Sequence, residues 1–433
     1  MNTRRLLWAL PTLVLACSGG GDSGVQPANQ PPTIAFNLTK LAVVRSAPTI
    51  LSVSVDDPDD DPLTVSWSIT RGILTPQNGA KTIMSWAVPA TVGSDTVVVT
   101  VSDGSHTRKI TEPVKVGWSA PSAPGTFLKS RSPYIITVDS ANPVFGIDEG
   151  LTSTVEAGTE LFLDNEDTRI DVTGRFVTLG TADEPVIIRP NVRNLNCGTD
   201  DRGWWESVQV SHSAGGADPG EIEFHGTEVW YAQYGVRLLN DSSARIVGGA
   251  IRCSEAAGVL HQGSGTLSMM DTEVSNGMAD GIVIGSLIGT AIPDSVLISG
   301  CTVEFNERNG VVVSVEDPSQ SAWVALDYNH IKNNSFRGMT LARSVFPAVH
   351  FNLFNGNGAG GALINIYLED DFGAGSGLTT LNAACNYFAV TTQSAIDVTI
   401  RDSLDNPVLV PVRVDTDPWL TADPRTTTPT CTP

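Results

Sequence analysis

Short clusters of acidic side chains are the residues best suited to acid–base chemistry in this chain. Glycoside hydrolases use two carboxylates, one as general acid and the other as base or nucleophile. The densest group is Glu369, Asp370 and Asp371, and further carboxylates are available at Asp271, Asp280, Asp294, Glu316 and Asp317. No spacing among them matches a glycosidase motif, so a solvated acidic loop is the alternative. Glu369, Asp370 and Asp371 are the candidate catalytic residues.

A lyase would need a base to abstract a proton beside a carboxylate, usually with calcium to neutralise that acid. Lys332 is the only lysine after Lys129, and no matched aspartate cluster accompanies it. The six histidines have no metal-ligand spacing, and the sequence has no nucleophile elbow, phosphate-binding glycine loop or zinc motif. The sequence thus requires no cofactor.

Calcium is the one cofactor that the sequence suggests. Five carboxylates occupy six positions between residues 56 and 61, where they repel one another unless they are solvated or bridged by a cation. The candidate ligands are Asp57, Asp59, Asp61 and Asp103. The alternative is an acidic turn, because Asp-Pro-Asp is also favourable turn chemistry.

Length and charge limit the class of protein. The 433 residues predict two or more domains. The 47 acidic and 26 basic residues give a formal charge of −21, which repels phosphate backbones and excludes nucleic acid as a partner. Such acidity favours solubility outside the cell, and long helical patterns are nearly absent.

The N-terminus has the pattern of a secretion signal. Residues 1–17 have a basic start and an apolar run of about ten residues, too short for a permanent bilayer span. The ending Leu13-Val-Leu-Ala-Cys17 resembles the lipobox of bacterial lipoproteins, which implies acylation of Cys17. Ser18 after it implies the outer membrane or cell surface. Residues 18–32 form a flexible linker, so a lipid anchor is the expected membrane contact.

Residues 33–118 predict a small β-sandwich, since segments such as 51–55 and 96–101 alternate apolar and polar residues. The run Val55-Asp-Asp-Pro-Asp-Asp-Asp-Pro-Leu-Thr-Val-Ser-Trp67 resembles bacterial cadherin-like and PKD-like immunoglobulin-type domains. This resemblance implies a spacer or adhesion unit. Residues 119–127 are a Pro-rich linker, expected to hold this domain apart from the next one.

A repeated motif dominates residues 228–400. Its copies end on glycines separated by 23, 23, 29, 28 and 23 residues, namely Gly235, Gly258, Gly281, Gly310, Gly338 and Gly361. A period of this size, lengthened at one place, predicts a solenoid in which each coil buries its apolar face against the next.

Aligning the copies predicts which side chains stack. Two apolar columns are expected, one of Val274, Val303, Ile331 and Phe354 and another of Ile282, Val311, Met339 and Ala362. Asn306, Asn334 and Asn357 share a third position, where stacked amides can bond to one another. Their alternative role is sugar binding, but their fixed column indicates structure.

The ends of the repeat region resemble the right-handed parallel β-helix proteins of the pectin-lyase-like superfamily. The resemblance rests on segments 155–188, 203–208 and 385–402, in that order, and it covers residues 133–420. The fold prediction is an all-β chain: a single-stranded right-handed parallel β-helix over 128–420, the N-terminal sandwich, and a Thr/Pro-rich tail at 421–433.

Inserted loops are the expected site of function, because insertions in a solenoid gather on one face. They occupy residues 286–294, 316–322 and 370–377, and an earlier insertion covers 191–205. The candidate ligand-binding residues are Trp204, Trp205, Glu316, Asp317 and Asp370.

Five cysteines follow Cys17, so one is left over if the others pair. Cys253 and Cys301 suit either disulfides or small buried positions. A Cys385–Cys431 disulfide would join the tail to the last coil.

Two functions remain open from the sequence. The first is a monomeric, non-catalytic surface lipoprotein that binds extracellular polysaccharide or another surface protein. The alternative is a polysaccharide lyase or glycoside hydrolase that works along the β-helix groove, since fold alone does not decide function.

Overall fold

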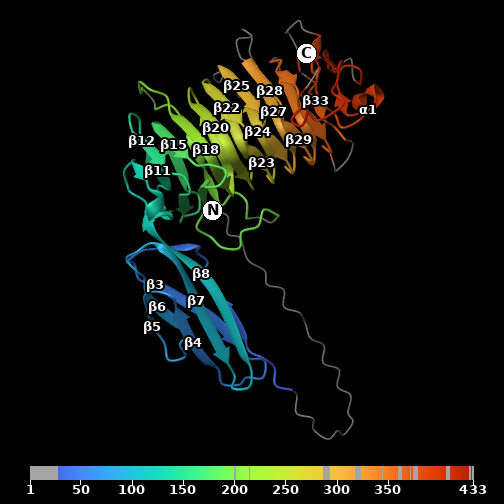
Figure 1. The fold of residues 1–433 in the computed structure, drawn as a ribbon. Coiled ribbons are helices and arrows are strands. Elements are labelled where there is room, and N and C mark those ends of the chain that lie inside the picture. Colours follow the sequence, from blue (N-terminus) through green and yellow to red (C-terminus); the bar gives the residue numbers. More distant parts are fainter. Residues whose placement is uncertain are drawn as a thin grey trace, which may run out of the picture.

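The computed structural model describes residues 28–198, 201–213, 215–285, 293–316, 323–343, 345–358, 363–370, 372–373, 379–405, 410–428 and 431. A small N-terminal β domain lies against the first coils of a long solenoid, and the C-terminal segment lies at its far end (Figure 1). The predicted all-β class is confirmed. None of the described helices has the length and apolar character needed to cross a bilayer.

Two sheets build the N-terminal domain. One is antiparallel in the order β1 (Thr33–Phe36), β3 (Thr49–Asp56), β6 (Ile83–Ala87) and β5 (Ile73–Pro76). The other joins β4 (Thr64–Ile69), β7 (Gly93–Ser102), β8 (Thr107–Ser119) and β2 (Ala42–Val44). Alternate residues of β7 are buried, and both sheets contribute to one apolar cluster that includes Leu51, Trp86 and Val99.

Three parallel sheets form the walls of the solenoid, and each coil gives one short strand or half-strand to each sheet. Sheet I contains β9 (Thr126–Phe127), β12 (Thr152–Val155), β15 (Arg175–Leu179), the first parts of β18 (Glu221–Trp230) and β20 (Ser243–Arg252), β22 (Thr266–Met270), β25 (Ser295–Ser299), β28 (Trp323–Asp327) and β31 (Ala348–His350).

Sheet II contains β10 (Tyr134–Ile136), β13 (Glu160–Leu163), β16 (Val186–Pro190), the second parts of β18 and β20, β23 (Glu273–Ser275), β26 (Thr302–Glu304), β29 (His330–Lys332) and β32 (Leu353–Asn355). Sheet III contains β11 (Val144–Ile147), β14 (Arg169–Val172), β17 (Trp205–Val210), β19 (Ala232–Leu239), β21 (Ala257–Gln262), β24 (Asp280–Gly285), β27 (Asn309–Val315), β30 (Arg337–Arg343), β33 (Ile366–Leu368) and β35 (Ile400–Arg401).

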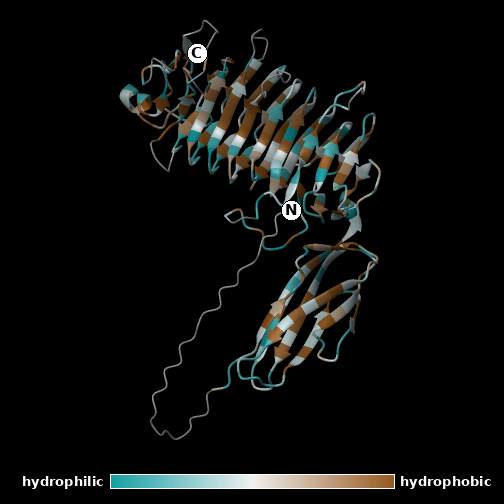
Figure 2. Ribbon diagram, turned by 180° about the vertical axis from the view of Figure 1, so that it is seen from behind, coloured by the Kyte–Doolittle hydropathy of each residue, from teal (hydrophilic) through white to brown (hydrophobic). Residues whose placement is uncertain are grey.

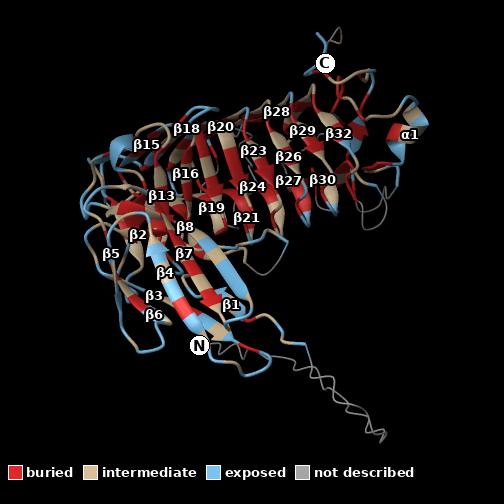
Figure 3. Cartoon of the chain, turned by 60° about the horizontal axis from the view of Figure 1, so that its bottom comes forward, coloured by how far each residue is buried: buried red, intermediate tan, exposed pale blue. Residues whose placement is uncertain are grey.

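Among the described residues, few elements lie outside the sheets of the two domains. They are the short 3-10 helix Lys129–Arg131, the helix α1 (Gln393–Asp397), and the parallel pair β34 (Thr380–Asn382) and β36 (Arg413–Asp415). Apolar and polar residues alternate along the strands (Figure 2), and the buried residues follow the solenoid strands (Figure 3). The inward side chains form one continuous core.

The predicted columns are confirmed with one exception. Register pairs Val274 with Val303, Ile331 and Phe354 in sheet II, and Ile282 with Val311 and Met339 in sheet III. Met339 then pairs with Ile366, so the assignment of Ala362 to this column is wrong. Ala362 lies outside the described residues. The extra residues before β33 shift the register of the last copy.

Two asparagine ladders stabilise the turns. In the turn between sheets II and III, Asn306 Nδ2 donates to Asn334 Oδ1 at 2.9 Å, and Asn334 Nδ2 donates to Asn357 Oδ1 at 3.0 Å. This is the predicted ladder. A second ladder, absent from the sequence prediction, links Asn329, Asn352 and Asn386 between sheets I and II. All six amides are buried, so the ladders are framework.

The long insertions at 286–294, 316–322 and 370–377 share one phase, since each follows a sheet III strand. The insertion at 191–205 lies instead between sheets II and III, where Cys197 forms a disulfide with Cys253. Cys385 is bonded to Cys431, as the sequence suggested, and Cys301 is a buried free thiol.

The two domains are in direct contact, so the expectation that residues 119–127 hold them apart is wrong. Strand β8 continues through Ser119 and pairs with β10 at the edge of sheet II. Asn191 exchanges two hydrogen bonds, of 2.8 and 2.9 Å, with the backbone of Ala42. Lys115 forms an ion pair with Glu160 at 2.5 Å.

Candidate functional site

The outer face of sheet II carries ion pairs that cross from coil to coil. Arg252 on β20 contacts Glu273 on β23 at 2.6 Å and Glu228 on β18 at 3.7 Å. The hydrogen bond from Arg252 lowers the pKa of the Glu273 carboxyl and raises the pKa of Arg252. Ser275 donates a second hydrogen bond to Glu273, at 2.6 Å.

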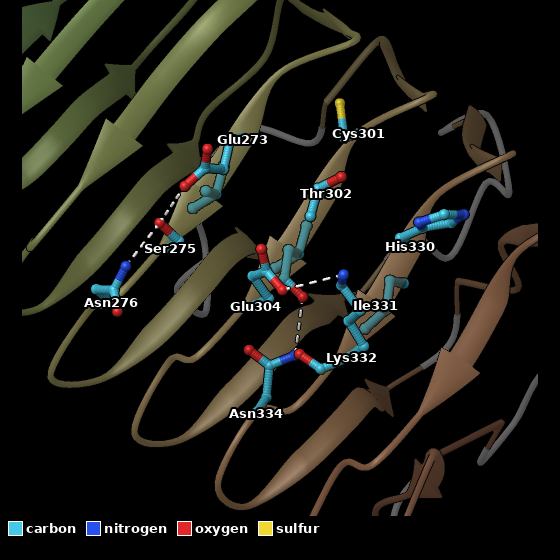
Figure 4. Close-up of polar contacts among 12 residues, drawn as sticks. Glu273, Ser275, Asn276, Cys301, Thr302, Glu304, His330, Ile331, Lys332 and Asn334 are labelled. Carbon is cyan, nitrogen blue, oxygen red and sulfur yellow. Dashed lines mark hydrogen bonds and ion pairs between the residues drawn. The ribbon is translucent and has the colours of Figure 1, made fainter.

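The same pairing continues toward the C-terminus on this face. Lys332 on β29 faces Glu304 on β26 at 3.2 Å (Figure 4). His330 contacts Asp423 of the C-terminal segment at 2.9 Å, and burial is the main reason that its pKa is lowered. Because Lys332 already neutralises a neighbouring glutamate, it is a poor candidate for the base of a lyase.

A chain of polar side chains crosses the outer face of sheet III. Asn309 Nδ2 donates to Asp280 Oδ1 at 2.7 Å, and Thr340 Oγ1 donates to Asn309 Oδ1 at 3.1 Å. Arg337 reaches Thr340 at 3.5 Å and Glu369 at 3.1 Å. The chain therefore links four successive coils, a span of roughly 14 Å at about 4.8 Å per strand.

Two aromatic rings hold the guanidinium of Arg337. It lies 3.3 Å from the ring centroid of Tyr367 and 4.4 Å from that of Phe336. Phe336 is 49% exposed, which leaves an aromatic surface beside the Arg337–Glu369 pair. Tyr367 comes from β33 and Phe336 from the turn before β30, so the coil stacking brings them together.

A pocket of about 320 Å³ lies further along the same edge of the solenoid. Its walls include Trp204, Arg202, Asp201, Asp167, Glu255 and Met278. Arg202 also forms an ion pair with Glu307 at 2.5 Å, which connects the pocket to the coil that carries Asn309. The pocket and the chain from Asp280 to Glu369 both lie where the chain enters sheet III, and they are together called the lateral strip below.

The structure separates the predicted ligand-binding residues. Trp204 lines the pocket. Trp205 is fully buried in the core and donates its indole N–H to the Trp230 carbonyl at 2.8 Å. The prediction that Trp205 contacts ligand is therefore wrong. Glu316 pairs with Arg343 at 3.0 Å, and Asp370 is exposed. Asp317 lies outside the described residues.

Of the candidate catalytic residues, Glu369 belongs to the lateral strip through its ion pair with Arg337. Asp370 is next to it in sequence, and Asp371 lies outside the described residues, as does Cys17. One residue position was missed: Asp280, Asn309 and Arg337 each immediately precede a glycine of the repeat. Aligning that position across the copies would have identified this polar column.

The aspartates proposed as calcium ligands mostly bond to backbone. Asp57 Oδ1 accepts from the amides of Asp59 and Asp61 at 3.0 and 3.2 Å, and Asp59 accepts from the amide of Gln30. Asp103 accepts from the amides of Ser105 and His106, and these bonds lower its pKa. In the part of the chain that the structure describes, no three acidic, histidine or cysteine side chains converge as metal ligands.

One atom in this loop would suit a cation. Asp57 Oδ2 is buried without a hydrogen-bond partner. A single orphaned oxygen falls well short of the six to eight oxygens that calcium takes. The geometry therefore agrees with an acidic turn stabilised by aspartate-to-backbone bonds, and calcium stays an untested prediction.

Comparison with known families defines the class of the solenoid. A family model described as a right-handed β-helix region matches residues 205–365. Together with the three parallel sheets, this match identifies a right-handed parallel β-helix domain within the chain. No curated protein and no solved structure matches the sequence.

Proposed function

We propose that the protein is a cell-surface binding protein whose β-helix holds an extracellular polysaccharide, or another surface partner, along the lateral strip without transforming it. The observation that carries this proposal is the polar chain from Asp280 to Glu369. Its centre, Asn309 and Thr340, is buried, whereas Asp280, Arg337 and Glu369 are partly exposed, and these charged groups are linked through the two buried residues. The exposed part, the Arg337–Glu369 pair beside the half-exposed ring of Phe336, is held in place by this network and suits a polyhydroxylated chain.

The mode of attachment belongs to the same proposal. The lipobox-like sequence before Cys17 supports lipid anchoring at the outer membrane or cell surface, and the immunoglobulin-type resemblance of the N-terminal domain supports a spacer role. Metabolic labelling with a radioactive fatty acid tests the anchor. The full chain should be labelled and the variant Cys17→Ala should not; equal labelling of both would contradict lipidation at this cysteine.

The binding test uses the purified protein and a panel of polysaccharides, with and without added calcium. We expect retention of at least one polysaccharide with no new reducing or unsaturated ends. Trp204→Ala and Arg337→Met should weaken retention at least several-fold. Arg175→Met is the matched control, because Arg175 lies on sheet I, where it pairs with Glu221 and Glu223. Equal retention by all variants would contradict a site in the strip.

The enzymatic alternative is favoured by one observation, the several carboxylates that line the Trp204 pocket. Asp201, Asp167 and Glu255 all reach it, so a general acid and a general base are available there. The same polysaccharide panel decides between the two functions. New reducing ends that disappear in Glu255→Gln would establish hydrolysis and overturn the binding-only proposal.

A further inference from the structure

A second cavity lies between the two domains, away from the lateral strip. It has a volume of about 240 Å³, and strands β2 and β8 of the N-terminal domain run beside β13 and β16 of sheet II around it (Figure 3). Its apolar walls come from both domains and include Leu41, Pro113, Phe162, Ile187 and Trp230. Neither domain forms this cavity alone.

Most charged groups around the cavity are paired. Lys115 contacts Glu160 at 2.5 Å, and Arg193 contacts Glu112 at 2.8 Å. Glu228, on the other wall, accepts from the indole N–H of Trp230 at 3.1 Å and lies 3.7 Å from Arg252. These groups fix the shape of the cavity and need no further partner.

Arg189 is the exception. Among the described residues its side chain has no ion pair and no hydrogen bond, and its Nε atom is buried without a partner. The ring centroid of Tyr231 lies 5.9 Å from the guanidinium carbon. Burial lowers the pKa of Arg189, while nearby Tyr231 and Glu160 oppose that effect. A partly buried guanidinium without an acceptor is unfavourable unless a ligand supplies one.

We propose that this cavity binds a small organic monocarboxylate with a flat apolar body, whose carboxylate is held by Arg189. A carboxylate matches the planar fork of a guanidinium and can accept two parallel hydrogen bonds. The body lies against Phe162, Ile187 and Trp230. Glu160 and Glu228 line the same space and disfavour a dianion such as phosphate.

Size limits the ligand further. The cavity is smaller than the roughly 300 Å³ at which drug-sized pockets begin, so the ligand has about one ring. Binding would also join the domains, because the ligand contacts both of them. This second role for the domain junction is independent of the polysaccharide-binding proposal.

The test is isothermal titration of the whole protein with 3-phenylpropanoate and with its neutral amide, 3-phenylpropanamide. We expect the acid to bind and the amide to bind at least tenfold more weakly. Arg189→Met should weaken binding of the acid at least tenfold, whereas Arg175→Met should change it by less than twofold. The proposal is overturned if the acid does not bind, if the amide binds equally well, or if Arg189→Met binds like the unmodified protein.

Thermal unfolding without ligand separates a binding role from a structural one. If the role of Arg189 is to bind a ligand, Arg189→Met removes an unpaired charge from the free protein. The variant protein should then unfold at the same or a higher temperature. A clearly lower unfolding temperature would show that the arginine stabilises the fold and would overturn the proposal. Arg189→Lys tests the geometry, because it keeps the positive charge but loses the planar guanidinium. Its affinity for the acid should fall between those of the unmodified protein and Arg189→Met.

Discussion

At the scale of single residues, His261 is a histidine buried in the apolar core of the solenoid. It occupies an inward position of sheet III between Leu238 and Ile284, and it is fully buried. Neither ring nitrogen has a hydrogen-bond partner within normal geometry. Burial lowers its pKa from 6.5 to about 4, only partly opposed by the Gly265 backbone and by Asp294.

The lowered pKa predicts acid sensitivity. His261 binds a proton near pH 6.5 in the unfolded chain and only near pH 4 in the folded chain. Its contribution to the free energy of unfolding is therefore fully present above pH 6.5 and is lost as the pH falls toward 4. The loss should approach about 3 kcal/mol. Urea unfolding at pH 7.5 and 4.5 measures it. His261→Leu should reduce the difference, and an undiminished difference in this variant would contradict the role of His261.

At the scale of elements, the asparagine ladders set how well one coil adheres to the next. Asn334→Ala removes the amide that bonds both Asn306 and Asn357, which leaves buried polar groups unpaired. We expect the free energy of unfolding to fall by about 2–4 kcal/mol. Asn355→Ala, at an exposed position one coil away, should change it by less than about 0.5 kcal/mol. Equal effects in chemical denaturation would mean that the ladder contributes nothing.

The Cys385–Cys431 disulfide closes a second element, the C-terminal segment, against the last coil. The bond spans 46 residues, and Asp423 adds the contact with His330. Cys431→Ser should destabilise this end by about 2–4 kcal/mol, since the segment gains freedom when released. Hydrogen exchange should accelerate in residues 410–428 and stay unchanged in β13 and β16. Unchanged exchange at 410–428 would show that packing alone holds the segment.

The repeat in the sequence predicted the stacked apolar columns and one asparagine ladder, but not the register where coil lengths differ. The columns through Val303 and Val311 and the ladder through Asn334 follow from the period of the motif, because equivalent residues of stacked coils must pair. The column assignment failed at Ala362, where extra residues change the register.

The candidate site was harder to predict because its partners are separated by irregular coil lengths. Arg337 and Glu369 are 32 residues apart, and Arg202 and Glu307 are 105 apart. No local pattern encodes either pair. Trp204 and Trp205 show a related difficulty. They are neighbours at the start of one strand, yet Trp204 lines a pocket and Trp205 points into the core.

At the scale of the whole molecule, the N-terminal domain is a cap on the first coil of the solenoid. Strand β8 extends the edge of sheet II by pairing with β10, which protects an otherwise open strand. Ala42 packs in a small apolar cluster with Ile135 and Phe162. A proline-rich segment does not keep domains apart when a strand crosses the boundary, which explains why composition alone gave the wrong expectation.

Asn191 is where this docking can be tested. Its buried amide bonds the backbone N–H and C=O of Ala42 at 2.8 and 2.9 Å and donates to Asp164 at 2.9 Å. Asn191→Ala leaves both backbone groups unpaired, at a cost of about 1–3 kcal/mol each unless the domains separate and water replaces the amide. We therefore expect faster hydrogen exchange at β2 and β10 and a larger radius of gyration in small-angle scattering. Exposed Asn142→Ala is the control. If exchange and dimensions match in both variants, the junction is held by its apolar contacts and the ion pair between Lys115 and Glu160.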